Sequence, residues 1–283
     1  MPRHQLDLDG AAPRADGSVR VTWVGNATVL LELDGFRVLT DPNFLHQGDH
    51  AKLGGGLRSR RLHDPAFELR ELLPVDLVVL SHHHGDHWDE VADREVPKDV
   101  PIVTTAHAAR KLAKAGFRRT LVVDTWEEAV IRRGDRELRI TSLPGKHAPQ
   151  PLQSVLPPVM GSMLDLRTPA GALRVYVSGD TLLHDGLREI PARYPGIDLA
   201  LVHLGGTRVL GILLTMDGAQ GAEALELLDP EEAIPIHYEE YTVMKSPLSD
   251  FEAAADRRRL RTQLHRLERG GSMAFPLRAA RPG

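Results

Sequence analysis

Short runs that alternate apolar and polar residues dominate the first part of the chain. Val19–Trp23, Thr28–Leu33 and Phe36–Thr40 each have the two-residue period of a half-buried strand. Asp34-Gly35 separates the last two runs and is a strong signal for a two-residue hairpin turn. Leu77–Leu80 is continuously apolar and predicts a strand that is buried on both faces.

Beyond residue 100 the predicted strands alternate with helices. Paired runs around Gly134-Asp135 and around Pro169-Ala170-Gly171 indicate two more hairpins. The predicted strands are Pro101–Thr104, Leu121–Asp124, Ala129–Arg132, Glu137–Thr141, Ser162–Arg167, Leu173–Ser178, Asp198–Leu204, Ala233–His237 and Ser272–Pro276. The predicted helices are Ala106–Ala115, Ala219–Leu228 and Ser249–Glu268. This order favours an α/β (α+β) fold in which two sheets pack face to face with helices outside.

Two stretches lack a clear strand or helix pattern. Residues 1–18 are polar and predict a loose N-terminal arm, and residues 19–283 are expected to form a single domain. Residues 43–72 are rich in charge, contain Gly54-Gly55-Gly56 and predict a long irregular insertion.

Composition limits the chemistry that the chain can perform. The 283 residues carry a net charge of −4 and include no cysteine. Disulfides, thiolate ligands and cysteine nucleophiles are therefore excluded, and nitrogen and oxygen would bind any metal. The charges form no basic face for nucleic acid. No apolar run approaches the ~20 residues of a membrane span, and the N-terminus lacks a signal-peptide pattern. We expect a cytoplasmic protein with a small-molecule substrate and no membrane or nucleic-acid partner; a homo-oligomer stays open.

The most informative segment directly follows Leu77–Leu80. Residues 82–87 read His-His-His-Gly-Asp-His. If the chain is still extended, His82 and His84 project to the same side and can share one cation. His83 points the other way and is interpreted as a structural residue.

The second half of this segment offers a different pair of ligands. Gly85 permits a sharp turn, after which Asp86 and His87 can hold a second cation. Imidazole suits zinc, iron and manganese, and carboxylates add negative charge and a hard oxygen ligand. A surface histidine tract that binds metal adventitiously is the alternative. It fits less well, because the segment follows a buried strand and precedes a helix.

Three later residues are further candidate ligands because each follows a predicted strand. They are His147 after Ile140–Leu143, Asp180 after Arg174–Ser178 and His237 after Ala233–Ile236. Strand ends are rigid positions from which scaffolds present ligands. A single histidine at a strand end is more often a residue with a structural hydrogen bond than a ligand, so each candidate alone is a weak signal. Their joint appearance after H-x-H-x-D-H predicts a site for two metal ions.

This order of motifs resembles the metallo-β-lactamase superfamily. Within it, the chain is most similar to the branch that holds ascorbate-phosphate lactonase and the N-acyl-phosphatidylethanolamine phospholipase D-like enzymes. The further motifs are Trp23-Val24-Gly25-Asn26-Ala27-Thr28, Leu39-Thr40-Asp41-Pro42, Val75-Asp76-Leu77-Val78-Val79-Leu80-Ser81 and Ile234-Pro235-Ile236-His237-Tyr238. The resemblance runs from residue 20 to residue 276. It implies a four-layer αββα sandwich with the metals in a cleft at one edge.

The resemblance also implies a role for each ligand. The first metal would be bound by His82, His84 and His147, the second by Asp86, His87 and His237, and Asp180 would bridge the two. Asp41 would fix the orientation of a ligand imidazole. Asn26 stands where phospholipase-like members usually carry histidine, and the 43–72 insertion lacks their proline-rich pattern. These two departures argue against a lipid substrate.

The resemblance and the ligand set predict a metal-dependent hydrolase of a small ester-type bond, a lactone or a phosphoester. Two close divalent cations lower the pKa of a water toward neutrality. We expect zinc, with manganese or iron open. Asp86 would orient the nucleophile, and His203 and Tyr238 lie near ligands in the sequence as further candidate catalytic residues.

Two alternatives to this function stay open. A nuclease-type phosphodiesterase of the same fold would need a basic groove or an accessory domain, and neither is visible. The intact ligand set argues against a non-catalytic metal-binding regulatory protein, because such proteins usually lose the catalytic residues first. The sequence leaves the substrate, the native metal and the oligomeric state open.

The segment after His147 predicts one wall of the substrate pocket. Ala148–Gly161 is too apolar for a solvated loop and too rich in proline for a helix. Because the chain leaves the cleft at His147, we expect this segment to cover the metals, with Leu156 and Met160 facing the substrate. A connection that only covers the core is the alternative.

Overall fold

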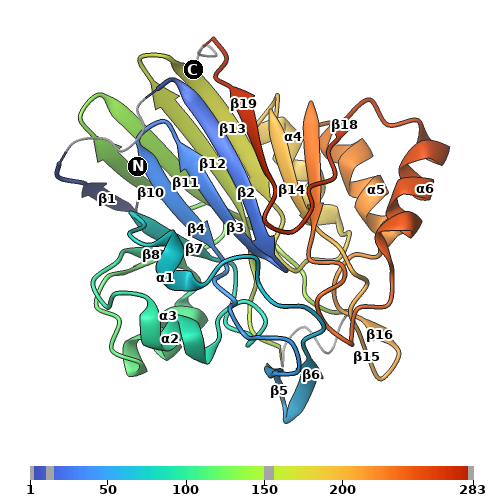
Figure 1. The fold of residues 1–283 in the computed structure, drawn as a ribbon. Helices are drawn as coiled ribbons and strands as arrows, with labels where there is room; N and C mark the ends of the chain where they lie inside the picture. Colours follow the sequence, from blue (N-terminus) through green and yellow to red (C-terminus); the bar gives the residue numbers. More distant parts are fainter. Residues whose placement is uncertain (1–2, 11–15, 150–155, 280–283) are drawn as a thin grey trace.

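Two large β-sheets pack face to face in the computed structural model, which describes residues 3–10, 16–149 and 156–279 (Figure 1). The strand order of the eight-stranded sheet is β1 (His4–Asp7), β10 (Glu128–Arg133), β11 (Arg136–Pro144), β12 (Met160–Thr168), β13 (Gly171–Val177), β14 (Leu199–His203), β17 (Glu232–Ile236) and β18 (Gln263–Leu264). The order of the seven-stranded sheet is β19 (Ser272–Pro276), β2 (Ser18–Gly25), β3 (Thr28–Leu33), β4 (Phe36–Thr40), β7 (Leu77–Leu80), β8 (Ile102–Thr104) and β9 (Thr120–Val122). Two short hairpins belong to neither sheet: β5 (His50–Gly54) with β6 (Leu57–Arg60), and β15 (Arg208–Val209) with β16 (Ile212–Leu213).

Helices cover the outer face of each sheet. They are α1 (Leu69–Leu72), α2 (Glu90–Glu95), α3 (Ala106–Lys114), α4 (Glu189–Arg193), α5 (Gly218–Leu228) and α6 (Leu248–Arg258). Ala92 of α2 and Leu112 of α3 pack on the seven-stranded sheet, and Leu225 of α5 and Phe251 of α6 pack with the core of the eight-stranded sheet. This arrangement confirms the four-layer αββα sandwich. Within the described residues, no helix is long and apolar enough to cross a membrane.

Alternation along the strands divides the apolar side chains between two cores. In β7, Leu77 and Val79 join the core between the sheets, whereas Val78 and Leu80 join the core beneath α1–α3. A strand covered on both faces needs apolar residues at every position, and this explains the uninterrupted run in the sequence. Each of the predicted strands overlaps an observed one.

The N-terminal arm is more ordered than the sequence predicted. His4–Asp7 form β1, which pairs in parallel with β10 at the edge of the eight-stranded sheet. Leu6 and Leu8 pack against the main core. The expectation of a loose arm was therefore wrong for these residues, because an exposed sheet edge offers backbone partners that a short polar segment can use.

The 43–72 insertion is also structured rather than irregular. Its centre is the β5–β6 hairpin, which turns at Gly55-Gly56 with positive φ at both residues. The side chain of Arg61 is fully buried and donates hydrogen bonds to the carbonyl oxygens of Asn43 and His63. The contact between Arg61 and Asn43 spans 18 positions of the chain and helps to order a segment that has little periodicity of its own.

The last helix is shorter than predicted. Helix α6 ends at Arg258 rather than at Glu268, because Arg259 adopts a left-handed backbone with φ of +53°. Leu260 then packs against the core, and Gln263–Leu264 pair with β17 as the last strand of the sheet.

Candidate metal centre

The carboxyl ends of strands from both sheets meet at one edge of the sandwich. Strands β13, β14 and β17 are parallel, and β11 shares their direction because it is antiparallel to β12, which is antiparallel to β13. The residues that follow β11, β13 and β17, which are His147, Asp180 and His237, therefore reach the same edge. The loop after β7 brings His82–His87 to them from the other sheet.

His82, His84 and His147 form the first group of candidate ligands. Nδ1 of His84 lies 3.0 Å from Nε2 of His82 and 3.2 Å from Nε2 of His147. Nitrogens bound tetrahedrally to zinc at ~2.0–2.1 Å lie about 3.3–3.4 Å apart, so this spacing fits a shared cation. Burial, followed by repulsion from His147, lowers the pKa of His84 to about 3. Burial also lowers the pKa of His82 and of His147, so the three imidazoles are neutral at pH 7, the form that binds metal.

Asp86, His87, Asp180 and His237 form the second group, and all four are buried. Oδ2 of Asp180 lies 3.3 Å from Nε2 of His87, and Oδ2 of Asp86 lies 3.6 Å from Nε2 of His237. Burial disfavours a charge on His87, yet the carboxylates of Asp180, Asp41 and Asp86 raise its pKa well above the usual value. These carboxylates therefore require positive charge, which a divalent cation would supply.

Several ligand atoms have no hydrogen-bond partner among the described residues. These buried atoms, all in the second group, are Oδ1 of Asp86, Nε2 of His87, Oδ1 of Asp180 and Nε2 of His237. An unpaired buried polar group costs about 1–3 kcal/mol, and such groups are rare in folded proteins. Within each group the ligand atoms lie within 4.8 Å of one another, so the residues fit bound cations.

Asp180 acts on both groups electrostatically. Its charge raises the pKa of His82, His84 and His147 of the first group, against the larger effect of burial, and it raises the pKa of His87 in the second. Its carboxylate also accepts a hydrogen bond from the hydroxyl of Thr215 at 3.3 Å. Asp180 therefore lies where a bridging ligand is expected.

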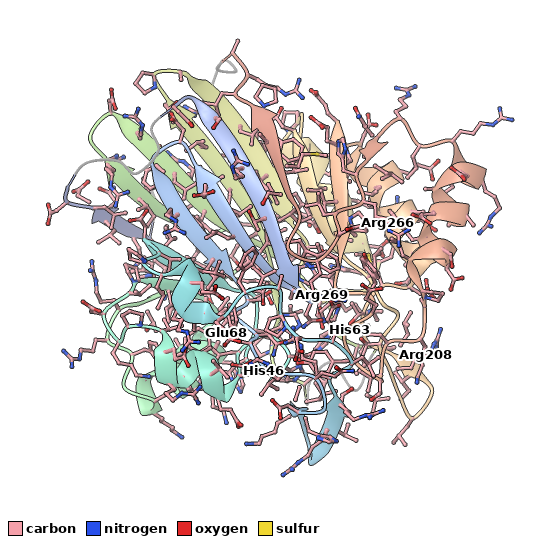
Figure 2. All side chains as sticks on the ribbon, viewed as in Figure 1. His46, His63, Glu68, Arg208, Arg266 and Arg269 are labelled. Carbon is pink, nitrogen blue, oxygen red and sulfur yellow. The ribbon has the colours of Figure 1, made fainter. Side chains whose placement is uncertain are left out.

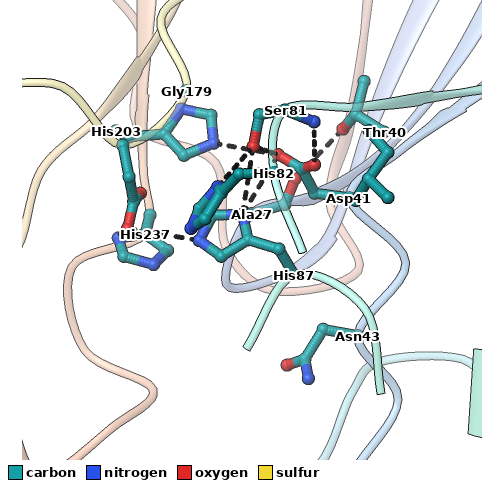
Figure 3. Close-up of polar contacts among 12 residues, drawn as sticks. Ala27, Thr40, Asp41, Asn43, Ser81, His82, His87, Gly179, His203 and His237 are labelled. Atoms are coloured by element: carbon teal, nitrogen blue, oxygen red, sulfur yellow. Dashed lines mark hydrogen bonds and ion pairs between the residues drawn. The ribbon is translucent and has the colours of Figure 1, made fainter. Parts of the chain in front are cut away.

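Asp41 and Ser81 hold His87 from behind (Figure 3). Oδ2 of Asp41 lies 3.1 Å from Nδ1 of His87 and accepts a hydrogen bond from the Ser81 hydroxyl at 2.9 Å. A proton on Nδ1 directs Nε2 of His87 toward the second group. Burial disfavours the charge on Asp41, but His87 and His203 lower its pKa below the usual value. Asp41 therefore has the geometry of the positioning residue that the sequence resemblance implied.

We expect Asp41→Asn to lower metal affinity about 10–100-fold while the fold is retained. Asparagine preserves the shape of the side chain but removes the charge that holds the His87 proton. Metal titration against a chelator measures the affinity, and thermal unfolding of the metal-free protein is the control. An unchanged affinity would show that Asp41 does not orient His87.

The reason for glycine at position 85 differs from the one that the sequence suggested. Gly85 does not adopt a left-handed backbone. Instead, β5 lies directly over it: a Cβ atom would come within 2.5 Å of the Lys52 nitrogen, and the Gly85 N–H donates to the Lys52 carbonyl oxygen at 2.8 Å. The absent side chain therefore allows the β5–β6 hairpin to dock on the ligand loop.

The ligand groups open into a cavity of about 780 Å³. His84, Asp86, His147 and Asp180 line it together with His83 of the ligand loop, and much of the remaining wall comes from both hairpins, from α2 and α3, and from Leu156. A volume of this size holds a drug-sized molecule. The β5–β6 hairpin, which the sequence did not place, thus forms part of the substrate site.

A comparison with known families supports this interpretation of the site. The model of the beta-lactamase superfamily domain matches residues 36–238, which is more than half of the chain and includes all the candidate ligands. The chain belongs to the beta-lactamase superfamily. The resemblance seen in the sequence is thereby confirmed at the level of the superfamily.

Curated members of the superfamily include relatives with modest identity to this chain. An uncharacterized protein of Mycobacterium tuberculosis is 28% identical over 253 residues, with 83% of this chain and 62% of the relative covered. The chain thus spans 62% of the length of that relative. A UPF0173 metal-dependent hydrolase of Archaeoglobus fulgidus is 26% identical over 263 residues, with 91% of this chain and 99% of the relative covered.

Solved structures share the fold of this chain. The isothiocyanate hydrolase from Delia radicum gut bacteria superposes with a TM-score of 0.76 at 22% identity, covering 91% of this chain and 99% of that one. The metallo hydrolase Igni18 from Ignicoccus hospitalis superposes with a TM-score of 0.68 at 22% identity, covering 92% and 100%. At this identity the likeness establishes the shared fold.

The other predicted catalytic residues lie away from the cavity wall. His203 is fully buried behind the ligands, with Nε2 3.6 Å from Oδ2 of Asp41 and Nδ1 3.2 Å from the Ser178 hydroxyl. Tyr238 packs against Trp23 with ring centroids 5.3 Å apart. Neither lines the cavity. His203 therefore has the geometry of a positioning residue rather than the substrate contact expected, and Tyr238 that of a core residue.

Asn26 has a role at the site that the sequence did not reveal. Its side-chain amide donates to the main-chain carbonyl of Asp86 at 2.6 Å, and its own main-chain carbonyl accepts from the His237 N–H at 3.1 Å. Asn26 and His237 both have left-handed backbones, with φ of +52° and +59°. Strained residues often cluster at functional sites. The signal in the sequence was the departure from the histidine that phospholipase-like members usually carry.

The residues after His147 lie partly in the wall of the cavity and partly in the core between the sheets. Residues 150–155 lie outside the described residues. Leu156 and Pro157 line the cavity as expected, but Met160 begins β12 and is buried in the core between the sheets. The prediction for Met160 was wrong, because strand pairing with β11 turns its side chain inward.

We expect serine to have opposite effects at these two positions. Met160→Ser should lower the free energy of unfolding by about 2–5 kcal/mol, since it empties a core site, and leave KM nearly unchanged. Leu156→Ser should change KM with little effect on stability. Denaturant unfolding and steady-state kinetics separate the outcomes. Equal loss of stability in both variants would remove Leu156 from the pocket wall.

Proposed function

We propose that this protein is a metal-dependent hydrolase that cleaves a small ester-type bond, a lactone or a phosphoester, with two divalent metal ions, which we take to be zinc. The observation that carries the proposal is the pair of buried ligand groups around Asp180 at the base of a cavity. The three converging imidazole nitrogens of the first group and the unpaired ligand atoms of the second group support two ions rather than one. The hydrolase name of the Archaeoglobus relative and the lactonase-like motifs support the reaction class.

The side chains of this centre have separable roles. His82, His84 and His147 would hold one ion, Asp86, His87 and His237 the other, and Asp180 would neutralise both. Bound divalent ions supply Lewis-acid polarisation of the scissile group and lower the pKa of a water toward neutrality.

Asp86 is the residue best placed to handle a proton. Its Oδ1 is buried without a hydrogen-bond partner among the described residues, and the residue lines the cavity. A carboxylate in this position accepts a hydrogen bond from the attacking water and orients it. We propose Asp86 as the catalytic residue of the chain. Its carboxylate has two oxygens, so one can bind the metal while the other accepts a proton.

A small-molecule substrate fits the cavity better than nucleic acid does. The wall near hairpin β15–β16 is formed by Val209, Ile212 and Leu214, which cannot neutralise a phosphate backbone. A cavity of this size suits a partly apolar ester. The lining also carries Lys52 and Lys111, but five carboxylates outnumber these two lysines, so the cavity is not the basic groove that a nuclease needs.

Metal loading followed by a substrate panel tests the proposal. We expect two ions per chain after loading with zinc, manganese or iron, and turnover of at least one class among lactones, phosphodiesters and phosphomonoesters. The panel should include an isothiocyanate, the substrate in the name of the structural neighbour. A stoichiometry that stays at one ion defeats the two-metal site, and a loaded protein inert on the whole panel defeats the ester-type hydrolase.

The two adjacent histidines offer a matched control for metal binding. His84→Ala should remove metal from the first group, since His84 faces both His82 and His147. His83→Ala should leave the metal content nearly intact, because His83 belongs to neither ligand group. Loss of metal from both variants would mean that the loop, not the ligand, had been damaged.

A further inference from the structure

Large apolar side chains are exposed at two places among the described residues, and both are on the rim of the cavity. Leu210 is 94% exposed and Leu57 is 43% exposed. Leu210 is in the turn of β15–β16, and Leu57 begins β6; both line the cavity. Figure 1 shows the two hairpins as neighbouring projections from the same end of the sandwich. Isolated exposed leucines are ordinary, but their confinement to one rim indicates a function there.

The backbone gives a second, independent reason to single out Leu210. The β15–β16 hairpin has a two-residue turn, with φ of +51° at Leu210 and +83° at Gly211. A turn with positive φ at both positions favours Asn-Gly, and a leucine there is sterically unfavourable. The conformation of Leu210 therefore opposes folding, and its exposed side chain contributes almost no burial to offset that cost. A role in binding explains why an apolar side chain is at this position.

Apolar surface continues from this rim to the metal centre. Val209, Ile212 and Leu214 line the cavity below Leu210. The carbonyl oxygen of Leu214 accepts a hydrogen bond from Nδ1 of the ligand His147 at 3.1 Å. One short segment thus connects the exposed turn to the first ligand group, and its apolar side chains form a path between them.

The opposite side of the cavity has a different character. Glu90, Asp93, His107 and Lys111, from α2 and α3, line that side. Figure 1 places α2 and α3 on the other side of β5–β6 from β15–β16. An apolar group of the substrate would therefore lie along β15–β16, and its polar group would face α3.

We propose that the substrate carries a linear apolar chain, such as an acyl or alkyl group, which runs from the metal centre along β15–β16 and ends between Leu210 and Leu57. This inference rests on the proposed function, because it concerns the substrate of the same site. We infer that a substrate chain covers these two leucines, because the apolar path leads from them into the cavity. Two leucines are also far too small a patch for a stable dimer, which needs ~800 Å² from each partner.

A chain-length series tests the path. Metal-loaded protein is titrated with linear carboxylates from acetate to decanoate, which mimic an acid product, and kinetics are measured on esters of the same acids. Each methylene that reaches the apolar path should tighten binding by up to about fourfold, and kcat/KM should rise in parallel. An affinity that does not depend on chain length overturns the inference.

Leu210→Asn is the decisive variant because it separates binding from stability. Asparagine accepts the left-handed backbone, so the variant should be at least as stable as the parent protein. We expect it to lose about tenfold in affinity for decanoate, with acetate unaffected. Leu57→Ser, on the other side of the rim, should also weaken the binding of the long-chain carboxylates.

Arg259→Asn provides the matched control. Arg259 has a similar φ of +53° but caps α6 and does not line the cavity. Arg266, which is exposed and does not line the cavity (Figure 2), gives a second control as Arg266→Gln. Both controls should keep the parent dependence on chain length. If either control lowers the affinity for decanoate as much as Leu210→Asn does, the effect is not due to the apolar rim.

The outcomes distinguish this inference from the function on which it rests. If decanoate binding depends on Leu210 but the protein hydrolyses no ester, the proposed path for the apolar chain stands and the proposed hydrolase function fails. If the protein hydrolyses esters at rates that do not depend on chain length, the hydrolase function stands and the proposed path for the apolar chain fails. In a third outcome, carboxylate affinity does not depend on chain length, and Leu210→Asn abolishes only the sedimentation of the protein with phosphatidylcholine vesicles or only its self-association. Either result assigns the rim to another occupant and overturns the inference.

Discussion

Replacement of Asp180 by asparagine is expected to reduce turnover by about 10²–10³-fold while leaving the fold intact. The carboxylate faces His87 and His237 of the second group, at 3.3 Å and 3.6 Å, and its charge also acts on the first group. An amide keeps the shape but cannot neutralise two cations. Metal content, kcat and thermal unfolding of the metal-free protein are measured on the same preparation.

Asp165→Asn is the matched control for this charge removal. Asp165 is in β12 of the same sheet and pairs with Arg174, away from the metal centre. It should affect stability slightly and turnover not at all. Equal losses of turnover and stability in Asp180→Asn would instead identify Asp180 as a structural residue of the sheet edge.

Gly85→Ala should have the second large effect, because it inserts an atom between the ligand loop and β5. The added Cβ would meet backbone atoms of Lys52, which cannot rotate away as a flexible side chain could. Overpacking of this kind destabilises by about 1–3 kcal/mol. The hairpin that must move carries Leu53 and Gly54 of the cavity wall, and a displacement of ~1 Å near a reacting group can cost up to about 10²-fold in rate.

Gly116→Ala separates this steric effect from the general cost of replacing glycine. Gly116 follows α3 with a φ of +90°, and an added Cβ would meet no atom within 4 Å. That variant should lose stability through backbone strain but retain kcat/KM. If Gly85→Ala retains the kinetics of the parent protein, the β5–β6 hairpin does not position the substrate.

The sequence by itself determined the sandwich and the candidate ligands of the metal centre. Period-two alternation and the continuous run in β7 depend only on which faces of a strand are covered, so they can be read locally. The spacing H-x-H-x-D-H and the positions of His147, Asp180 and His237 after strands identified the candidate ligands, and the family resemblance implied the two groups in which the fold brings them together.

Only the tertiary structure decided what surrounds those ligands. Asp41 reaches His87, Lys52 covers Gly85 and Leu214 holds His147 across long separations in the sequence, which no local pattern encodes. The same holds for the two hairpins, whose short strands have too few residues for a clear period. Their exposed leucines become informative only when exposure and position on the rim are known, because leucine in a sequence normally predicts burial.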